Sequence, residues 1–278
     1  MSNIIKENDF VKIIIPPNTH EKYQIVIPRT ENYDVIVVVQ ENSNLSLDID
    51  LKEVKNINLC LTFELERNAS LKEDVFSIEN EGNIKIEQNV TLLANASFTG
   101  VTFDTSKGNI EFENNVYLKE ENANSYIRNA VVSDNDSNKK FTINTFNEVF
   151  NTSSLMDNYG VTKENAKLDF IGIGKVVSGA HGSTNRQNSK IIVFDETSKA
   201  NISPYLFIDE YDVIASHAAA VGKVNEDHLY YMTSRGLTPE TARQYITLGY
   251  LLPVLNYFED ETVKSRITKM LERRVNNA

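Results

Sequence analysis

Cysteine and tryptophan are almost absent from this sequence: Cys60 is the single cysteine among 278 residues, and tryptophan does not occur. One cysteine excludes an internal disulfide, and one chain with one thiol cannot build a thiolate cage around a metal or a cluster. Cys60 stands beside Leu59, Leu61 and Phe63 in a strand-like run, where a free cysteine usually behaves as a small buried hydrophobe. We therefore expect Cys60 to be a core residue.

Basic charge is also scarce. The chain has 28 Lys and Arg against 39 Asp and Glu, so its formal net charge is 28 − 39 = −11. A negative surface repels a polyphosphate backbone, and we expect no nucleic acid partner.

Long hydrophobic runs and export signals are missing as well. The apolar stretch Val35–Val39 is far too short to cross a bilayer as a helix, and the charged first ten residues show no secretion signal. P-loop, dinucleotide-binding and G-x-S-x-G motifs do not occur, which argues against nucleotide binding and serine hydrolysis. We expect a cytoplasmic protein with no membrane partner.

Alternating apolar residues fill the chain from Val11 to about Val224. Leu45, Leu47 and Ile49 illustrate the period of two, which is typical of strands. Many short strands with tight corners and no helices between them fit a sandwich, a barrel or a solenoid of stacked coils. We favour the solenoid, with coils of roughly 20–30 residues.

Clusters rich in Asn and Gly separate the strand-like runs. Both residue types tolerate the left-handed backbone that we expect at sharp corners. The clusters are 41–44, 80–83, 107–109 and 134–138.

Helical signals begin after Lys223. Asn225 can cap one helix that ends at Gly236, and Thr238-Pro239 can start a second, with Ala242, Tyr245, Ile246 and Gly249 on one face. We expect Pro253 to kink or end that helix near Leu252, and a third helix over about 261–275. We therefore divide the chain into a β-domain, 1–224, and a helical domain, 225–278. The apolar helical faces could pack on the β-domain or dock a partner.

His217 is the histidine with the most unusual surroundings, because it lies in the strand-like run Ser216-His217-Ala218-Ala219-Ala220-Val221-Gly222. Such small neighbours allow a second backbone or a cofactor to approach the imidazole, which is a good ligand for transition metals. The same pattern also fits a hydrogen-bonded core histidine in a tight strand.

An ordered series of segments occurs in the second half of the chain: Arg186-Gln187-Asn188-Ser189, Val193-Phe194-Asp195-Glu196, Ala200-Asn201-Ile202-Ser203-Pro204-Tyr205-Leu206-Phe207-Ile208, Asp212-Val213, Ala215-Ser216-His217, Val221-Gly222 and Tyr230-Tyr231-Met232-Thr233-Ser234-Arg235-Gly236-Leu237. Taken together, these segments resemble the SufB/SufD family of iron–sulfur cluster assembly proteins. The resemblance is good over roughly residues 175 to 252. It implies a right-handed parallel β-helix followed by a small helical domain.

Within the family the chain looks more like SufD than SufB. Ser216-His217-Ala218-Ala219-Ala220-Val221-Gly222 is similar to the SufD pattern, which places His217 on the histidine implicated in cluster assembly. SufB typically has His-Glu here and a cysteine near the Pro-Tyr pair, where this chain has Ala218 and Ser198. Ala215 replaces a residue that is often cysteine in SufD, so this chain can offer at most an imidazole, His217, to a cluster or metal.

The resemblance also implies partners. A non-catalytic scaffold subunit is expected to pair with a SufB-like chain through the β-helix and with a SufC-like ABC ATPase through the C-terminal helices. No cofactor is expected to be held stably by this chain alone, and an iron–sulfur cluster would be transient in the complex. The expected pairing surface is Asp209, Tyr211, Val213, Ala215, Ser216, Ala218, Ala219 and Val221, and the expected SufC-docking residues are Tyr230, Arg235, Gly236, Tyr245 and Gly249.

Two rival hypotheses stay open. The first is a structural β-solenoid without a role in iron–sulfur chemistry. Open solenoid ends expose unpaired strands, so a homodimer of the isolated chain is expected under either hypothesis. The second is a carbohydrate-active β-helix enzyme, which commonly carries the export signal that is missing here.

Overall fold

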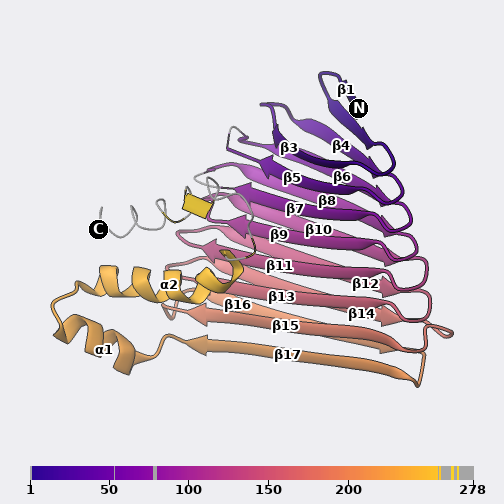
Figure 1. The fold of residues 1–278 in the computed structure, drawn as a ribbon. Helices are drawn as coiled ribbons and strands as arrows, with labels where there is room; N and C mark the ends of the chain where they lie inside the picture. The colour runs from indigo at the N-terminus through magenta and orange to yellow at the C-terminus, as the bar shows by residue number, and fades with distance from the viewer. Residues whose placement is uncertain are drawn as a thin grey trace.

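The computed structural model describes residues 2–52, 54–77, 80–255, 257, 264–265 and 268. Within these residues the chain forms a parallel β-solenoid followed by two helices, which confirms the predicted fold class (Figure 1). From β2 onward successive strands alternate between two sheets, and the strands of each sheet stack from the N-terminal end to the C-terminal end.

The described strands fall into a nine-stranded and an eight-stranded sheet. The first contains β1 (Asn3–Lys6), β2 (Phe10–Ile15), β4 (Asn32–Val39), β6 (Ile57–Leu65), β8 (Asn83–Leu92), β10 (Asn109–Leu118), β12 (Asn138–Asn147), β14 (Lys167–Val176) and β16 (Lys199–Ile208). The second contains β3 (His20–Val26), β5 (Asn44–Asp50), β7 (Ser70–Ser77), β9 (Ser97–Asp104), β11 (Asn124–Ser133), β13 (Ser153–Thr162), β15 (Ser183–Val193) and β17 (Val213–Lys223).

The register shows the length of one coil. His20 pairs with Asn44, Asn83 with Asn109, and Lys167 with Lys199, which gives coils of 44 − 20 = 24, 109 − 83 = 26 and 199 − 167 = 32 residues. The predicted coil length is confirmed, although the last coils are slightly longer. β1 is antiparallel to β2 and covers the edge of the nine-stranded sheet at the N-terminal end.

The solenoid interior is filled by alternate residues of both sheets. In β6 the buried positions are Ile57, Leu59, Leu61, Phe63 and Leu65, and they belong to one continuous hydrophobic core. Cys60 lies on the opposite, outer face and is only half-buried, so the expectation that it is a core residue is wrong. The alternation of a strand places Cys60 on the outer face, because Leu59 and Leu61 on either side of it point inward.

Asparagine forms most of the left-handed corners. Asn42, Asn68, Asn95 and Asn122 have φ between 57° and 59°, and each of the last three donates its amide to the preceding asparagine at 2.8–3.1 Å. Asn135 confirms the same expectation with φ 57°.

Glycine has a different role at two other corners. Gly82 and Gly108 have no positive φ, but a Cβ would collide with the carbonyl oxygen of Lys55 at Gly82 and with that of Gly82 at Gly108. The glycines there permit the close approach of stacked loops, so the expectation of a left-handed backbone is wrong at these two corners.

Two helices follow β17: α1 (Glu226–Ser234) and α2 (Pro239–Leu255). The Asn225 side chain accepts hydrogen bonds from the backbone N–H groups of Asp227 and His228, and Gly236 has φ 95°, so both predicted caps are confirmed. The Thr238 hydroxyl accepts from the backbone N–H of Thr241 at the start of α2, as predicted.

α2 continues to Leu255, so the predicted end of the helix near Leu252 is wrong, and the alternative of a kink at Pro253 stays a prediction. Leu251 and Val254 on either side are buried against the outer face of the eight-stranded sheet, in a second hydrophobic cluster with Phe76, Val101 and Phe103. That packing holds the last helical turn. The predicted third helix, 261–275, lies largely outside the described residues. Within this range only Lys264, Ser265 and Thr268 are described, and all three are helical.

The change from strand to helix occurs at the predicted boundary near residue 224, and the division into two domains stays a prediction. No helix in the described part of the chain is long and apolar enough to span a membrane.

Candidate functional site

The C-terminal end of the solenoid is formed by β16 and β17, the last strands of their sheets. β17 pairs with β15 along one edge, and its other edge has no strand partner among the described residues (Figure 1). A free parallel edge presents unpaired backbone N–H and C=O groups, which can pair with another chain. This end of the molecule is our candidate site.

His217 lies at this end in an inward-facing position. It pairs in register with buried Gln187 of β15, which in turn pairs with buried Met156 of β13. His217 nevertheless is exposed, because it occupies the last coil and no further strand of the described residues lies beside β17. The structure thus excludes the alternative of a buried core histidine.

The small neighbours of His217 leave its surroundings open. Ala218, Ala219 and Ala220 are exposed, and no heavy atom lies within 4 Å of a Cβ built on Gly222. A hollow of about 470 Å³ lies at the same end, lined in part by Val193, Ala200 and Val221. A second backbone can therefore approach β17 closely, as its composition predicts.

The predicted pairing residues lie together at this end. Val213 and Ala215 are half-buried, whereas the others are exposed: Asp209, Tyr211, Ser216, Ala218, Ala219 and Val221. Tyr211 projects fully into solvent.

Sequence reasoning missed the contribution of β16 to this surface. Tyr205 and Phe207 are 48% and 52% exposed, and their rings stack with centroids 6.5 Å apart. Ile208 is also exposed. The period-two spacing of Tyr205 and Phe207 predicts that both rings lie on one face of the strand, but only the structure shows that this face is exposed.

A polar layer lies directly beneath His217. The Gln187 amide donates to the backbone carbonyl of Tyr205 at 3.0 Å, and the Asn185 amide donates to Thr145 Oγ1 at 3.0 Å and Asn147 Oδ1 at 2.9 Å. Gln187 Oε1 and Asn185 Oδ1 are buried without a hydrogen-bond partner in the described structure. Sequence reasoning missed this layer, although Ser183, Asn185, Gln187 and Ser189 alternate along β15.

The predicted docking residues lie on α1, on α2 and in the turn between them. α1 has no buried residue, and Tyr230 is 75% exposed. Arg235 and Gly236 directly follow α1, and the Arg235 guanidinium lies 5.1 Å from the centre of the Tyr231 ring. On α2, Tyr245 and Gly249 are exposed while Ala242 is buried, so the face predicted for these residues is divided between solvent and the protein.

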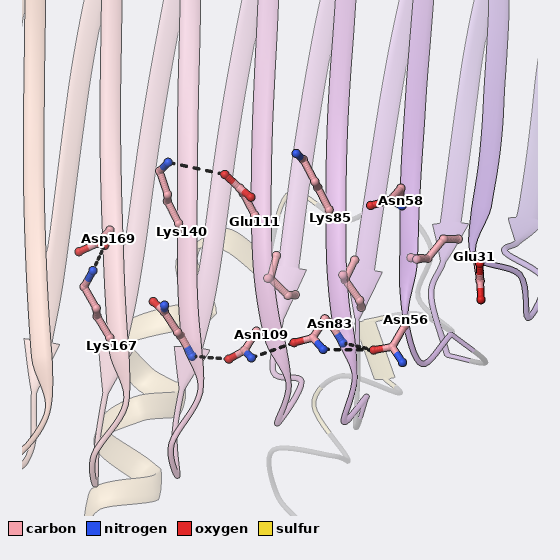
Figure 2. Close-up of a pocket in the computed structure, with 14 residues that line it drawn as sticks. Glu31, Asn56, Asn58, Asn83, Lys85, Asn109, Glu111, Lys140, Lys167 and Asp169 are labelled. Atoms are coloured by element: carbon pink, nitrogen blue, oxygen red, sulfur yellow. Dashed lines mark hydrogen bonds and ion pairs between the residues drawn. The ribbon is translucent and has the colours of Figure 1, made fainter.

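A larger groove, of about 640 Å³, crosses the outer face of the nine-stranded sheet (Figure 2). Many of its polar groups pair with one another. The Asn109 amide donates to Asn83 at 2.8 Å, Lys140 pairs with Glu111 at 3.6 Å, and Lys167 with Asp169 at 2.6 Å. The first two contacts connect successive coils, and the third joins two residues of β14. These polar groups have a structural explanation, so we do not take this groove as the functional site.

Within the described residues, no group of three or more His, Cys, Asp or Glu side chains is arranged to hold a metal ion. Cys60 is far from β17 in the stack of strands, and burial raises the pKa of its thiol, which disfavours the thiolate.

Comparison with known proteins identifies the family. The model of the SufBD core domain of the SUF system for FeS cluster assembly matches residues 24–250. The chain is 40% identical over 117 residues to the iron–sulfur cluster assembly protein SufD of Bacillus subtilis (strain 168), which covers 42% of this chain and 27% of that protein. Identity to SufB of the same organism is 30% over 103 residues, or 37% of this chain and 22% of that protein.

An iron–sulfur cluster assembly SufBD family protein of Mycobacterium tuberculosis (strain ATCC 25618 / H37Rv) is 35% identical over 104 residues, which are 37% of this chain and 12% of that protein. The matches thus span about a quarter or less of these relatives. Because the family model covers most of the solenoid, all of α1 and most of α2, the chain belongs to the SufBD family of the SUF iron–sulfur cluster assembly system.

Proposed function

We propose that this chain is a cytoplasmic, SufD-like scaffold subunit of an iron–sulfur cluster assembly complex, without catalytic activity of its own. In this proposal a SufB-like chain pairs with the open end at β16 and β17, and a SufC-like ABC ATPase docks on α1 and α2. The single observation that carries the proposal is an exposed imidazole, His217, on an edge strand with a free side.

The pairing surface has the properties of a protein interface. β17 offers backbone groups along its free edge, while Tyr205, Phe207 and Val221 offer exposed apolar area next to it. Aromatic residues are enriched at the centre of such interfaces. A strand of the partner would extend the eight-stranded sheet and cover His217 in the same step.

His217 would act where the two chains meet, as a terminal ligand to the transient cluster or as a group that handles protons. A neutral imidazole suits iron as a ligand. Since Ala215 and Ser216 precede it, this strand supplies no thiolate, and the remaining ligands would come from the partner or the cargo.

Co-purification with SufB-like and SufC-like partners tests the proposal. We expect Phe207→Glu and Val221→Glu to abolish recovery of the SufB-like chain, since each places a charge in the interface. Tyr230→Ala and Tyr245→Ala should reduce recovery of the ATPase alone. Ile4→Glu is the matched control, because Ile4 is equally exposed but lies at the opposite end of the solenoid. Pairing that survives both glutamate variants would refute the interface.

Point variants are a sharper test than removal of the chain after Val224. Leu251 and Val254 share a hydrophobic cluster with Phe76 and Phe103, so truncation would uncover the solenoid as well as remove the docking surface.

A second candidate function is self-association as a structural solenoid. The exposed apolar residues at the open end favour a homodimer when no partner is present. His217→Ala separates the two functions: it should keep pairing and lose cluster assembly in cells under our proposal, and should have no effect on assembly if the protein is only structural.

A further inference from the structure

Glu73 is a carboxyl group inside the solenoid. It occupies an inward position of β7, between Leu71 and Val75, and only 2% of the residue is exposed. Its register neighbours on β5 and β9 are Leu47 and Gly100. A buried ionised carboxylate needs donors or a cation to offset its lost hydration.

The Gln88 side chain supplies one such donor. Gln88 Nε2 donates to Glu73 Oε2 at 2.9 Å. Glu73 Oε1 and Gln88 Oε1 are both buried, and neither has a hydrogen-bond partner in the described structure. The pair therefore has two orphaned acceptor oxygens beside one hydrogen bond, and a single added proton can satisfy both.

Gly100 helps to make room for this pair. A Cβ on Gly100 would lie 2.8 Å from Phe98 Cζ and 3.5 Å from Glu73 Oε2. Glycine at this position thus leaves space for the Phe98 ring and the carboxyl group together.

The charges around Glu73 disfavour its ionised form. Asp74 is the neighbouring titratable group, and its charge acts in the same direction as burial. Burial is the main cause that raises the pKa of Glu73 to about 8, against the Gln88 hydrogen bond, which lowers it. The inward positions that β8 and β10 present here are uncharged: Ile86, Gln88, Val90, Phe112, Asn114 and Val116.

We propose that Glu73 is a proton-binding site in the solenoid interior, where the neutral acid and Gln88 form a cyclic pair. Glu73 Oε1–H donates to Gln88 Oε1, and Gln88 Nε2–H donates to Glu73 Oε2. Loss of the proton leaves a buried charge with one donor, and this weakens the middle coils.

The sign of the pH dependence follows from the proton count. In the unfolded chain Glu73 ionises near its usual value of 4.5, whereas in the fold it keeps its proton up to about pH 8. Between these values the folded state binds more protons, so stability falls as the pH rises, by up to about tenfold in the folding equilibrium per pH unit.

Denaturant unfolding of the full chain at pH 5, 6, 7 and 8 tests the proposal on wild type, Glu73→Gln and Glu64→Gln. An amide at position 73 keeps the donor and the acceptor without a titrating proton. The folding equilibrium constant of Glu73→Gln, divided by that of wild type, should therefore rise by about tenfold per pH unit from pH 5 to 8. Glu64 is exposed on the outer face of β6, and Glu64→Gln should show no such gain.

A pH-independent difference between Glu73→Gln and wild type would overturn the proposal. Side-chain ¹³C NMR of labelled glutamate in the wild-type chain gives an answer even where the variant fails to fold: a carboxyl midpoint near 8 is expected, and glutamates that all titrate below 6 overturn it. Replacement of potassium chloride by tetramethylammonium chloride should leave wild-type stability unchanged at pH 7. A loss of stability that is absent from Glu73→Gln would assign a cation to the site in place of the proton.

Discussion

The two ends of the solenoid fill their interiors with different kinds of side chain. In the N-terminal coils most inward side chains are apolar, as in Val35 and Val37 of β4 and Phe63 of β6, and Glu73 of β7 is an exception. In the C-terminal coils many inward side chains are polar, as in Asn158 of β13 and Gln187 of β15. The backbone ladder is parallel in both regions.

This difference associates the N-terminal coils with stability and the C-terminal coils with recognition of a partner. Apolar burial is non-directional and roughly proportional to area, so the N-terminal coils need only good packing. Polar interiors need specific partners, and here they form chains such as Asn129 to Asn158 at 2.7 Å and Asn158 to Ser189 at 2.9 Å. This row ends at Ser189, which pairs in register with Ala219 of β17, two residues from His217. The stack ends there, and we propose that a partner continues it.

The largest effect is expected in the apolar coils. Phe63→Ala should lower the free energy of unfolding by about 3–5 kcal/mol, because a fully buried ring in contact range of Phe98 is lost and a cavity remains. Equilibrium denaturation in urea measures the change. Phe207→Ala is the control at the other end, where half of the residue is already exposed and we expect less than about 1 kcal/mol. Equal effects would remove the contrast between the two ends.

A smaller effect is expected in the polar coils. Asn158→Ala should cost about 1–3 kcal/mol, because it leaves the Asn129 amide and the Ser189 hydroxyl without their shared partner. Asn201→Ala removes an exposed amide that bonds to Ser203 and should change stability by less than about 0.5 kcal/mol. An Asn158→Ala chain as stable as wild type would show that the polar layer does not hold these coils together.

The smallest effect is expected where α2 meets the C-terminal coils. Arg243 pairs with Asp195 at 2.7 Å, and the backbone N–H of Glu164 donates to the same carboxylate. Burial raises the pKa of Asp195, but these two groups outweigh it and the pKa falls below its usual 3.8. Its stabilisation is thus present at neutral pH and is lost as the pH falls below about 3.8.

Asp195→Asn should accordingly cost less than about 1 kcal/mol at pH 7, since the pair is partly exposed, and the difference from wild type should shrink toward pH 2. Urea denaturation at both pH values measures it. Glu196→Gln, which affects a more exposed pair with Lys223, should have no measurable effect at either pH. A cost for Asp195→Asn that is equal at both pH values would contradict the role of the ion pair.

Local rules accounted for most elements of the fold. The period of two in runs such as Leu45, Leu47 and Ile49 predicts strands and their inward faces, and Asn225 and Gly236 predict the ends of α1. Each of these features depends on a few residues that are neighbours in the sequence, so the sequence alone is sufficient to predict it.

The failures have causes outside the local sequence, with one exception. Cys60 is the exception, because its outward position follows from the inward positions of Leu59 and Leu61. Glycine is required at position 82 because the carbonyl oxygen of Lys55, one coil earlier, leaves no room for a Cβ. The last turn of α2, around Pro253, is held by the packing of Leu251 and Val254 on a sheet that is distant in the sequence. No window of sequence contains both partners of such contacts.

The sequence by itself determined that the chain forms many short strands of period two, where most of its corners lie and that His217 has small neighbours. Only the tertiary structure decided that His217 faces inward yet is exposed, that Tyr205 and Phe207 of the other sheet share its end, and that Gln187 and Asn185 form a polar layer beneath it. The physical reason is that strand periodicity is a property of adjacent residues, whereas exposure at the end of a stack depends on which coil is last.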